Sequence, residues 1–113
     1  MSISIDQFGA VEMKVGKILT AEEIPETDKL LKLSVDFGEA APRQVVSGIK
    51  HRIAIDRLVG MKAVFVVNLE PRMIRGLESQ AMILTASTTH EDGTVQFTIV
   101  GPIDDVPHGS KIS

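Results

Sequence analysis

The sequence has no cysteine, no tryptophan and no tyrosine, and its only aromatic side chains are Phe8, Phe37, Phe65 and Phe97. Without cysteine there can be no disulfide bond and no thiolate metal site, which fits a reducing compartment such as the cytosol. No apolar run reaches membrane-spanning length. The first residues also lack the basic region and apolar stretch of a signal peptide. We therefore expect a cytoplasmic protein without a membrane partner.

Groups suited to catalysis or metal binding are also scarce. The three histidines, at positions 51, 90 and 108, match no metal-binding spacing. No nucleophile–base arrangement and no glycine-rich phosphate loop is present. We expect a non-catalytic protein with no cofactor and no metal. A length of 113 residues predicts a single domain over residues 1–113 with a modest core.

Hydrophobic residues recur at every second position along most of the chain, which is typical of half-buried strands. The alternation is clearest in residues 11–15, 31–37 and 95–99, whereas residues 63–67 are continuously apolar and favour a central strand. Turn-forming residues separate these segments at 25–28, 38–42 and 91–93. Gly16 interrupts the first strand and predicts a bulge or sharp bend, which would let one strand serve both halves of a small barrel.

Residues 50–60 are the only helical candidate. Ile53, Ile55 and Leu58 line one face of a short helix that Gly60 would end. Five strands with a short helix between the third and fourth are the layout of an OB-fold. We therefore predict an all-β, five-stranded OB-fold barrel with a short helical link between strands 3 and 4 and extra terminal segments.

Charge is distributed unevenly along the chain. The formal net charge is −3, yet residues 43–75 hold seven Lys or Arg and two acidic residues. A chain that is acidic overall can still present a positive face, because screening limits the reach of each charge to about 10 Å. Ordinary solvated surface charges explain the same composition, so composition alone does not decide between the two interpretations.

The segment from residue 68 to 82, NLEPRMIRGLESQAM, follows the apolar run 63–67. A polar, basic loop at the end of a buried strand is a common way for a rigid scaffold to present a binding surface. Arg72 and Arg75 are suited to bidentate contacts with phosphate. Asn68 is suited to bind a ligand or to satisfy nearby backbone. Met82 is as consistent with the core as with the surface.

This segment resembles the signature of a tRNA-binding domain, with N-L-x-P-R from residue 68 and G-x-x-S-x-x-M from residue 76. The domain occurs free-standing, appended to some methionyl-tRNA synthetases, and in synthetase cofactors of the cytokine-precursor type. Blocks at residues 8–18, 28–38 and 43–49 resemble the same family in the same order. The sequence departs from the family pattern at Met73, where Lys is common, and at Ala81, where Gly is usual.

The resemblance implies structure-specific binding of tRNA by a homodimer that associates through the terminal segments 1–8 and 101–113. With few aromatic rings available for stacking, shape and phosphate contacts suit these residues better. The apolar Val106 and Ile112 favour a packed tail over a disordered one. The expected RNA-binding residues are Lys32, Arg43, Lys50, Arg52, Asn68, Arg72, Arg75, Ser79 and Met82.

Two other functions stay open. A relative of this family resembles a secretion chaperone that binds peptides in an apolar groove, and an exposed apolar patch would favour that function. That relative lacks the blocks Asp-Lys-Leu-Leu and Val-Val-Ser-Gly-Ile, which are present here and favour tRNA. The chain is also suited to dock an aminoacyl-tRNA synthetase, a role that is compatible with tRNA binding.

Overall fold

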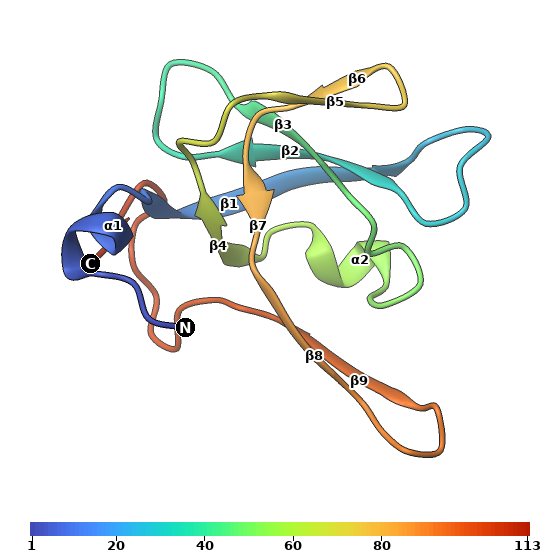
Figure 1. Cartoon of the computed structure of the whole chain (residues 1–113). Helices are drawn as coiled ribbons and strands as arrows, with labels where there is room; N and C mark the ends of the chain where they lie inside the picture. The colour runs from blue at the N-terminus through green and yellow to red at the C-terminus, as the bar shows by residue number, and fades with distance from the viewer.

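The computed structural model describes all 113 residues and consists mainly of β-strands (Figure 1). Two short helices are present, α1 (Ile5–Gly9) and α2 (Ile55–Leu58). The strands are β1 (Met13–Glu23), β2 (Leu31–Asp36), β3 (Arg43–Ser47), β4 (Lys62–Val66), β5 (Arg72–Ile74), β6 (Leu77–Ser79), β7 (Met82–Ile83), β8 (Thr85–Thr89), β9 (Val95–Ile99) and β10 (Lys111–Ile112).

Five antiparallel strands form a nearly closed barrel in the order β3-β2-β1-β4-β7. The long strand β1 serves both halves, because residues 13–17 pair with β4 and residues 17–23 pair with β2. The open seam is bridged between β3 and the residues before β7, where the Gln80 amide donates to the Gln44 carbonyl at 2.8 Å. The helix α2 lies between β3 and β4, so the predicted OB-fold-like barrel with its helical link is confirmed.

The core follows directly from the sequence pattern. Leu31, Leu33 and Val35 of β2 are fully buried, and the residues between them are half-buried. Residues 63–67 are all buried, as their continuous apolar run predicts for a central strand. Phe65 meets Phe37 edge to face, with ring centroids 5.2 Å apart. Such a pair stabilises a core beyond the area that it buries.

The structure corrects the interpretation of Gly16. The irregularity in the β1–β2 pairing lies between Ile18 and Thr20, not at Gly16, which pairs regularly with Ala63 of β4. A Cβ on Gly16 would lie 2.6 Å from side-chain atoms of both Phe37 and Val35. Glycine is therefore needed here because the core packs against this backbone.

Segment 68–82 is also more ordered than a loop. It contains the hairpin β5–β6, with Arg72 paired opposite Ser79, and it ends in β7. A second hairpin, β8–β9, projects away from the barrel (Figure 1). No helix in the structure is both long and apolar enough to cross a membrane.

The C-terminal tail packs back on the barrel, as the apolar Val106 and Ile112 predicted. Both residues are half-buried, and Ile112 pairs with Met13 of β1. The Gly109 amide donates to the Val15 carbonyl at 2.7 Å, and Gly109 has a φ of 95°. A Cβ there would lie 2.5 Å from the Phe37 carbonyl oxygen, so only glycine allows this approach.

Candidate nucleic-acid interface

The tip of the β5–β6 hairpin places an arginine in an unusual backbone conformation. Ile74 pairs with Leu77, so Arg75 and Gly76 form a two-residue turn. Their φ angles are 52° and 80°, and two positive values define a type I′ turn. Asn, Asp or Gly is favoured at the first of these positions, and other residues cost on the order of 1 kcal/mol there. Arg75 is thus exposed in a strained conformation at the hairpin tip.

The strained tip faces the loop between β1 and β2. Arg75 and residues 24–27 line one shallow groove. An adjoining groove is lined by Arg75 together with Lys32, Glu22 and Glu23. Glu26, with a φ of 64°, is the only other non-glycine residue with positive φ, and it lies in the first groove. Backbone strain in this protein is therefore concentrated around one groove, a pattern typical of ligand-binding regions.

Two of the predicted RNA-binding lysines form ion pairs with glutamates. The Lys32 ammonium lies 3.4 Å from Glu22, its partner across the β1–β2 ladder, and the Lys50 ammonium lies 3.3 Å from Glu23. Both glutamates are well exposed, so these ion pairs contribute little to stability. A phosphate group can displace either carboxylate at small cost.

Three predicted arginines have no carboxylate partner. None of the ion pairs in the structure, which extend to 4.0 Å, involves Arg52, Arg72 or Arg75. All three side chains are exposed. Arg52 belongs to the loop after β3, which is joined to the β1–β2 loop by a hydrogen bond from the Lys50 amide to the Lys29 carbonyl. The β1–β2 loop is thus joined through its backbone to the loop that carries Arg52, while Arg75 lines a groove with residues 24–27.

Arg43 has a structural role that the sequence did not suggest. Its Nη1 donates to the carbonyls of Val67 at 2.6 Å and Gln80 at 3.1 Å, while Nε and Nη2 donate to the two carboxylate oxygens of Glu39. The guanidinium also lies 5.5 Å from the centroid of the Phe37 ring. The hydrogen bond from Arg43 holds the pKa of Glu39 below its usual value. Arg43 thus closes the barrel seam and is not free for phosphate.

Ser79 and Asn68 are likewise occupied. Ser79 is 5% exposed, and its hydroxyl accepts from the Val46 amide and donates to the Ala81 carbonyl. Ser79 was expected on the RNA-contacting surface, but the structure buries its hydroxyl at the seam. Asn68 accepts from the Glu12 amide at 2.9 Å and donates to the Ala10 carbonyl at 2.7 Å. It satisfies backbone, but in the N-terminal segment and not in its own loop.

The structure also places the remaining residues of the motif. Met82 is 40% exposed and lies at the surface, so the open choice between core and surface is resolved. Met73 is 67% exposed on the outer face of the hairpin, opposite Glu78. Ala81 is buried in the core, and its φ is not positive. Its methyl group therefore fills the core and does not approach a ligand.

Acidic side chains around the arginines are the feature that sequence reasoning missed. Glu22, Glu23 and Glu26 line the grooves beside Arg75. The only available signal was their position at the end of the first strand and in the turn that follows. Nowhere do three His, Cys, Asp or Glu side chains gather as a metal site would require. The grooves beside Arg75 therefore carry both positive and negative side chains, which suits a polar ligand that has both phosphates and hydrogen-bond donors.

Comparison with known proteins gives the family. The family model described as "Putative tRNA binding domain" matches residues 13–111. The chain belongs to this tRNA-binding domain family. It is 46% identical over 110 residues to a methionine–tRNA ligase of Methanococcus aeolicus and 44% identical to that of Myxococcus xanthus. In both cases 97% of the chain is covered, but the chain spans only 15% of the length of the ligase.

Solved structures agree with this membership. The methionyl-tRNA synthetase-related protein of Pyrococcus horikoshii superposes with a TM-score of 0.85 at 42% identity, covering 100% of this chain and 99% of the other. The chaperone CsaA of Bacillus anthracis superposes with a TM-score of 0.82 at 28% identity, covering both chains completely. The tRNA-binding domain described here is therefore similar both to synthetase domains and to a chaperone of the same fold.

Proposed function

We propose that this chain is a non-catalytic module that binds folded tRNA at the end of the barrel formed by the β5–β6 hairpin, the β1–β2 loop and the loop after β3. The observation that carries the proposal is the set of unpaired, exposed arginines at this end, with Arg75 held in a strained turn. Membership of a tRNA-binding family supports tRNA as the ligand. A cytosolic location and docking to an aminoacyl-tRNA synthetase belong to the same proposal, because close relatives are synthetase domains.

Among the predicted residues, we assign the contacts to a smaller set. Arg52, Arg72 and Arg75 provide phosphate contacts, with Lys32 and Lys50 joining when phosphate displaces Glu22 and Glu23. The nearby carboxylates accept hydrogen bonds from base amino groups or 2′-hydroxyls, so binding combines phosphate contacts with a shape-dependent polar fit. Met82 contributes apolar surface beside the hairpin. Arg43, Asn68 and Ser79 act only by holding the fold.

A titration with three ligands tests this proposal. We expect folded tRNA to bind more tightly than an unstructured RNA of equal length, and a short apolar peptide to bind weakly. With the three arginine contacts alone, affinity for tRNA falls by roughly 10–50-fold between about 50 mM and 200 mM salt, and it falls further when Lys32 and Lys50 also bind phosphate. Fluorescence anisotropy of labelled ligands at both salt concentrations gives these values. Equal binding of both RNAs contradicts recognition of a folded structure.

The peptide arm of that titration addresses a second function. Leu69, Met73 and Met82 are each at least 40% exposed, and CsaA, a chaperone by name, shares this fold. Exposed apolar surface of this kind favours protein partners. Peptide binding that is stronger than tRNA binding, and insensitive to salt, assigns the chain to a chaperone-like role instead.

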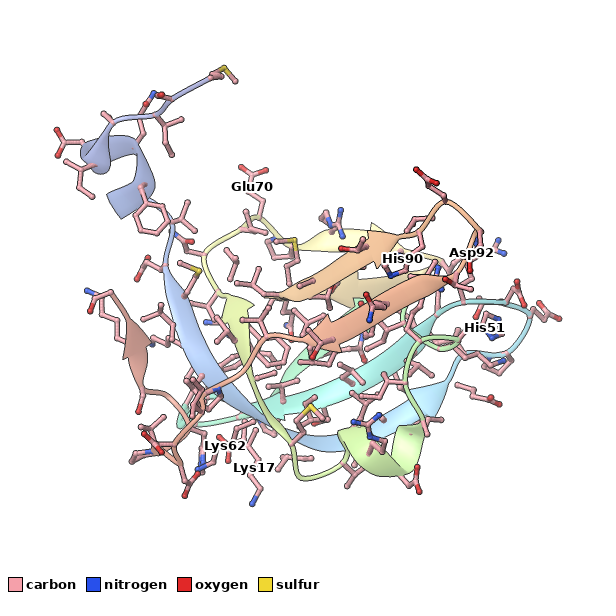
Figure 2. The ribbon with its side chains drawn as sticks, turned by 90° about the horizontal axis from the view of Figure 1, so that it is seen from below. Lys17, His51, Lys62, Glu70, His90 and Asp92 are labelled. Atoms are coloured by element: carbon pink, nitrogen blue, oxygen red, sulfur yellow. The ribbon has the colours of Figure 1, made fainter.

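A homodimer is part of the proposal, with the N-terminal segment as its main contact. Helix α1 has no buried residue, and Ile3, Ile5, Phe8 and Val11 are 42–81% exposed. Figure 2 shows this helix standing clear of the barrel. So much exposed apolar surface on one short segment requires a partner, and a second copy supplies one. The packed C-terminal tail contributes Ile103, which is fully exposed.

Replacing Ile5 and Phe8 with serine should disrupt this dimer. Each large apolar side chain contributes about 1.5–3 kcal/mol when buried, and a symmetric dimer loses both side chains from each chain, so we expect the dissociation constant to rise by more than about 100-fold. Sedimentation velocity measures the shift from about twice the chain mass of 12.2 kDa to a single chain. Met73→Ser, which removes an exposed apolar group elsewhere, should leave the dimer intact. A monomeric wild-type protein at tens of micromolar concentration, a range typical of weak dimers, contradicts the proposal.

A further inference from the structure

A separate pocket lies where α2, β4 and β9 meet, away from the β5–β6 hairpin. It has a volume of about 110 Å³. Arg52, Arg57 and Lys62 line it together with the half-buried Phe97 and Ile99. Figure 2 labels Lys62 on this side of the barrel. The pocket therefore combines a cationic rim with an apolar floor, and it shares Arg52 with the interface described above, whereas Arg57 and Phe97 lie outside that interface.

The charge in this pocket is unbalanced. No carboxylate lines it, in contrast to the grooves around Arg75. Arg52 and Arg57 take part in none of the ion pairs. Lys62 is already engaged, because its ammonium donates to Asp105 at 2.7 Å and to the Val106 carbonyl at 2.6 Å. The two unpaired guanidinium groups that line the pocket give it a positive charge that a bound anion can neutralise.

The floor of the pocket is apolar and preformed. Phe37 and Phe65 are buried in the core and Phe8 lies on α1, so Phe97 is the one ring of the barrel that faces a pocket while partly accessible. Beside the pocket, the Val64 amide donates to the Val100 carbonyl at 2.8 Å and so joins β4 to the residues after β9. At Gly101 the two backbones approach so closely that a Cβ would lie 2.8 Å from the Lys62 carbonyl. These two contacts hold β4 and the residues after β9 together next to the apolar floor.

We propose that one unpaired nucleotide of an RNA docks at this pocket, with only its base inside against Phe97 and Ile99 and its phosphate outside, at the rim, on Arg52 and Arg57. A phosphate alone needs only the cations, and the apolar floor beside them fits a base. Unpaired bases are bound in proteins by stacking on aromatic side chains next to arginines. The inference rests on the proposed function, because RNA supplies the nucleotide.

The test is a titration of the ¹⁵N-labelled full chain, followed by NMR, with adenosine 5′-monophosphate, inorganic phosphate and N-acetyl-leucine as separate probes. We expect the monophosphate to shift the amides of Met61, Phe97 and Gly101, with an affinity at least five-fold above that of phosphate or N-acetyl-leucine, in line with the value of one stacked base. Arg57→Gln should weaken it by at least five-fold. Phe97→Leu should leave the monophosphate no better than phosphate. Lys111→Gln, which removes an exposed cation on β10 outside the pocket lining, is the matched control and should have no effect.

Several outcomes overturn the inference. They are the absence of shifts in the pocket, equal affinity for the monophosphate and inorganic phosphate in the wild type, and tighter binding of N-acetyl-leucine, which marks a peptide site. A tRNA titration of the wild type and Arg57→Gln runs in parallel. Failure of tRNA to bind the wild type overturns the proposed function itself. Normal tRNA binding with no response of the pocket to the monophosphate overturns the pocket assignment alone.

Discussion

Arg43→Ala should lower the free energy of unfolding by about 2–3 kcal/mol, the largest stability effect that we expect from a polar residue in this chain. The substitution leaves the carbonyls of Val67 and Gln80 without their donor at the seam that closes the barrel. Hydrogen bonds from a charged donor contribute about 1.5–3 kcal/mol each, and partial access of water at this half-buried site reduces the sum. Urea denaturation followed by circular dichroism measures the change.

The matched control is Arg43→Lys, which keeps the charge but not the planar fork that reaches two carbonyls and a carboxylate at once. Most of the loss should persist in this variant. Affinity for tRNA, measured where the variant is fully folded, should stay within about two-fold of the wild type, an energy difference smaller than one phosphate contact. A large loss of tRNA binding with unchanged stability contradicts the structural role.

The contact between Arg43 and Glu39 also makes the free energy of unfolding depend on pH under acidic conditions. Because the hydrogen bond from Arg43 lowers the pKa of Glu39 from its usual 4.5, the ionised carboxylate is favoured in the folded state. That stabilisation is fully present above pH 4.5 and is lost as the pH falls through the lowered folded-state pKa. Arg43→Ala removes the cause of the shift, so its stability should depend less steeply on pH below 4.5 than that of the wild type.

The barrel could be predicted from the sequence because a single core imposes its period on every strand. In β2 the buried positions alternate with half-buried ones, and the sequence shows the same alternation of apolar and polar residues. In β4 both faces are covered, and the sequence shows a continuous apolar run. The link α2 was visible for the same reason, since Leu58 is its one buried residue. These features depend on local periodicity, which a sequence displays directly.

The candidate site could be predicted only in part, because the roles of its polar residues depend on contacts between distant segments. Arg43 bonds to residue 80 and Asn68 to residues 10 and 12. Neither set of hydrogen bonds can be inferred from residue types or their spacing along the chain. The turn at Arg75 and Gly76 had a local signal, an Arg-Gly pair between the apolar Ile74 and Leu77, but the polar, basic composition of residues 68–82 predicts a loop. Only the backbone angles distinguish an ordinary surface arginine from a strained one.

Arg75→Asn should change stability and tRNA binding in opposite directions. Asparagine adopts positive φ more readily than arginine and is favoured at the first central position of a type I′ turn. We therefore expect the free energy of unfolding to rise by about 0.5–1 kcal/mol. Affinity for tRNA should fall by about 10-fold, and the slope of affinity against salt should decrease by about one ion, because one phosphate contact is lost.

Adding Arg72→Ala should lower affinity to about 100-fold below the wild type, since a second unpaired cation leaves the same hairpin. Arg75→Lys provides the complementary control, because it keeps the charge and the unfavourable turn, and should retain most of the affinity without gaining stability. An ordinary solubilising arginine predicts a different result for Arg75→Asn, namely higher stability with unchanged tRNA binding. A protein that keeps arginine where asparagine is more stable does so for a contact made outside the chain. Opposite signs of the two measurements therefore connect the strain at this turn to the ligand.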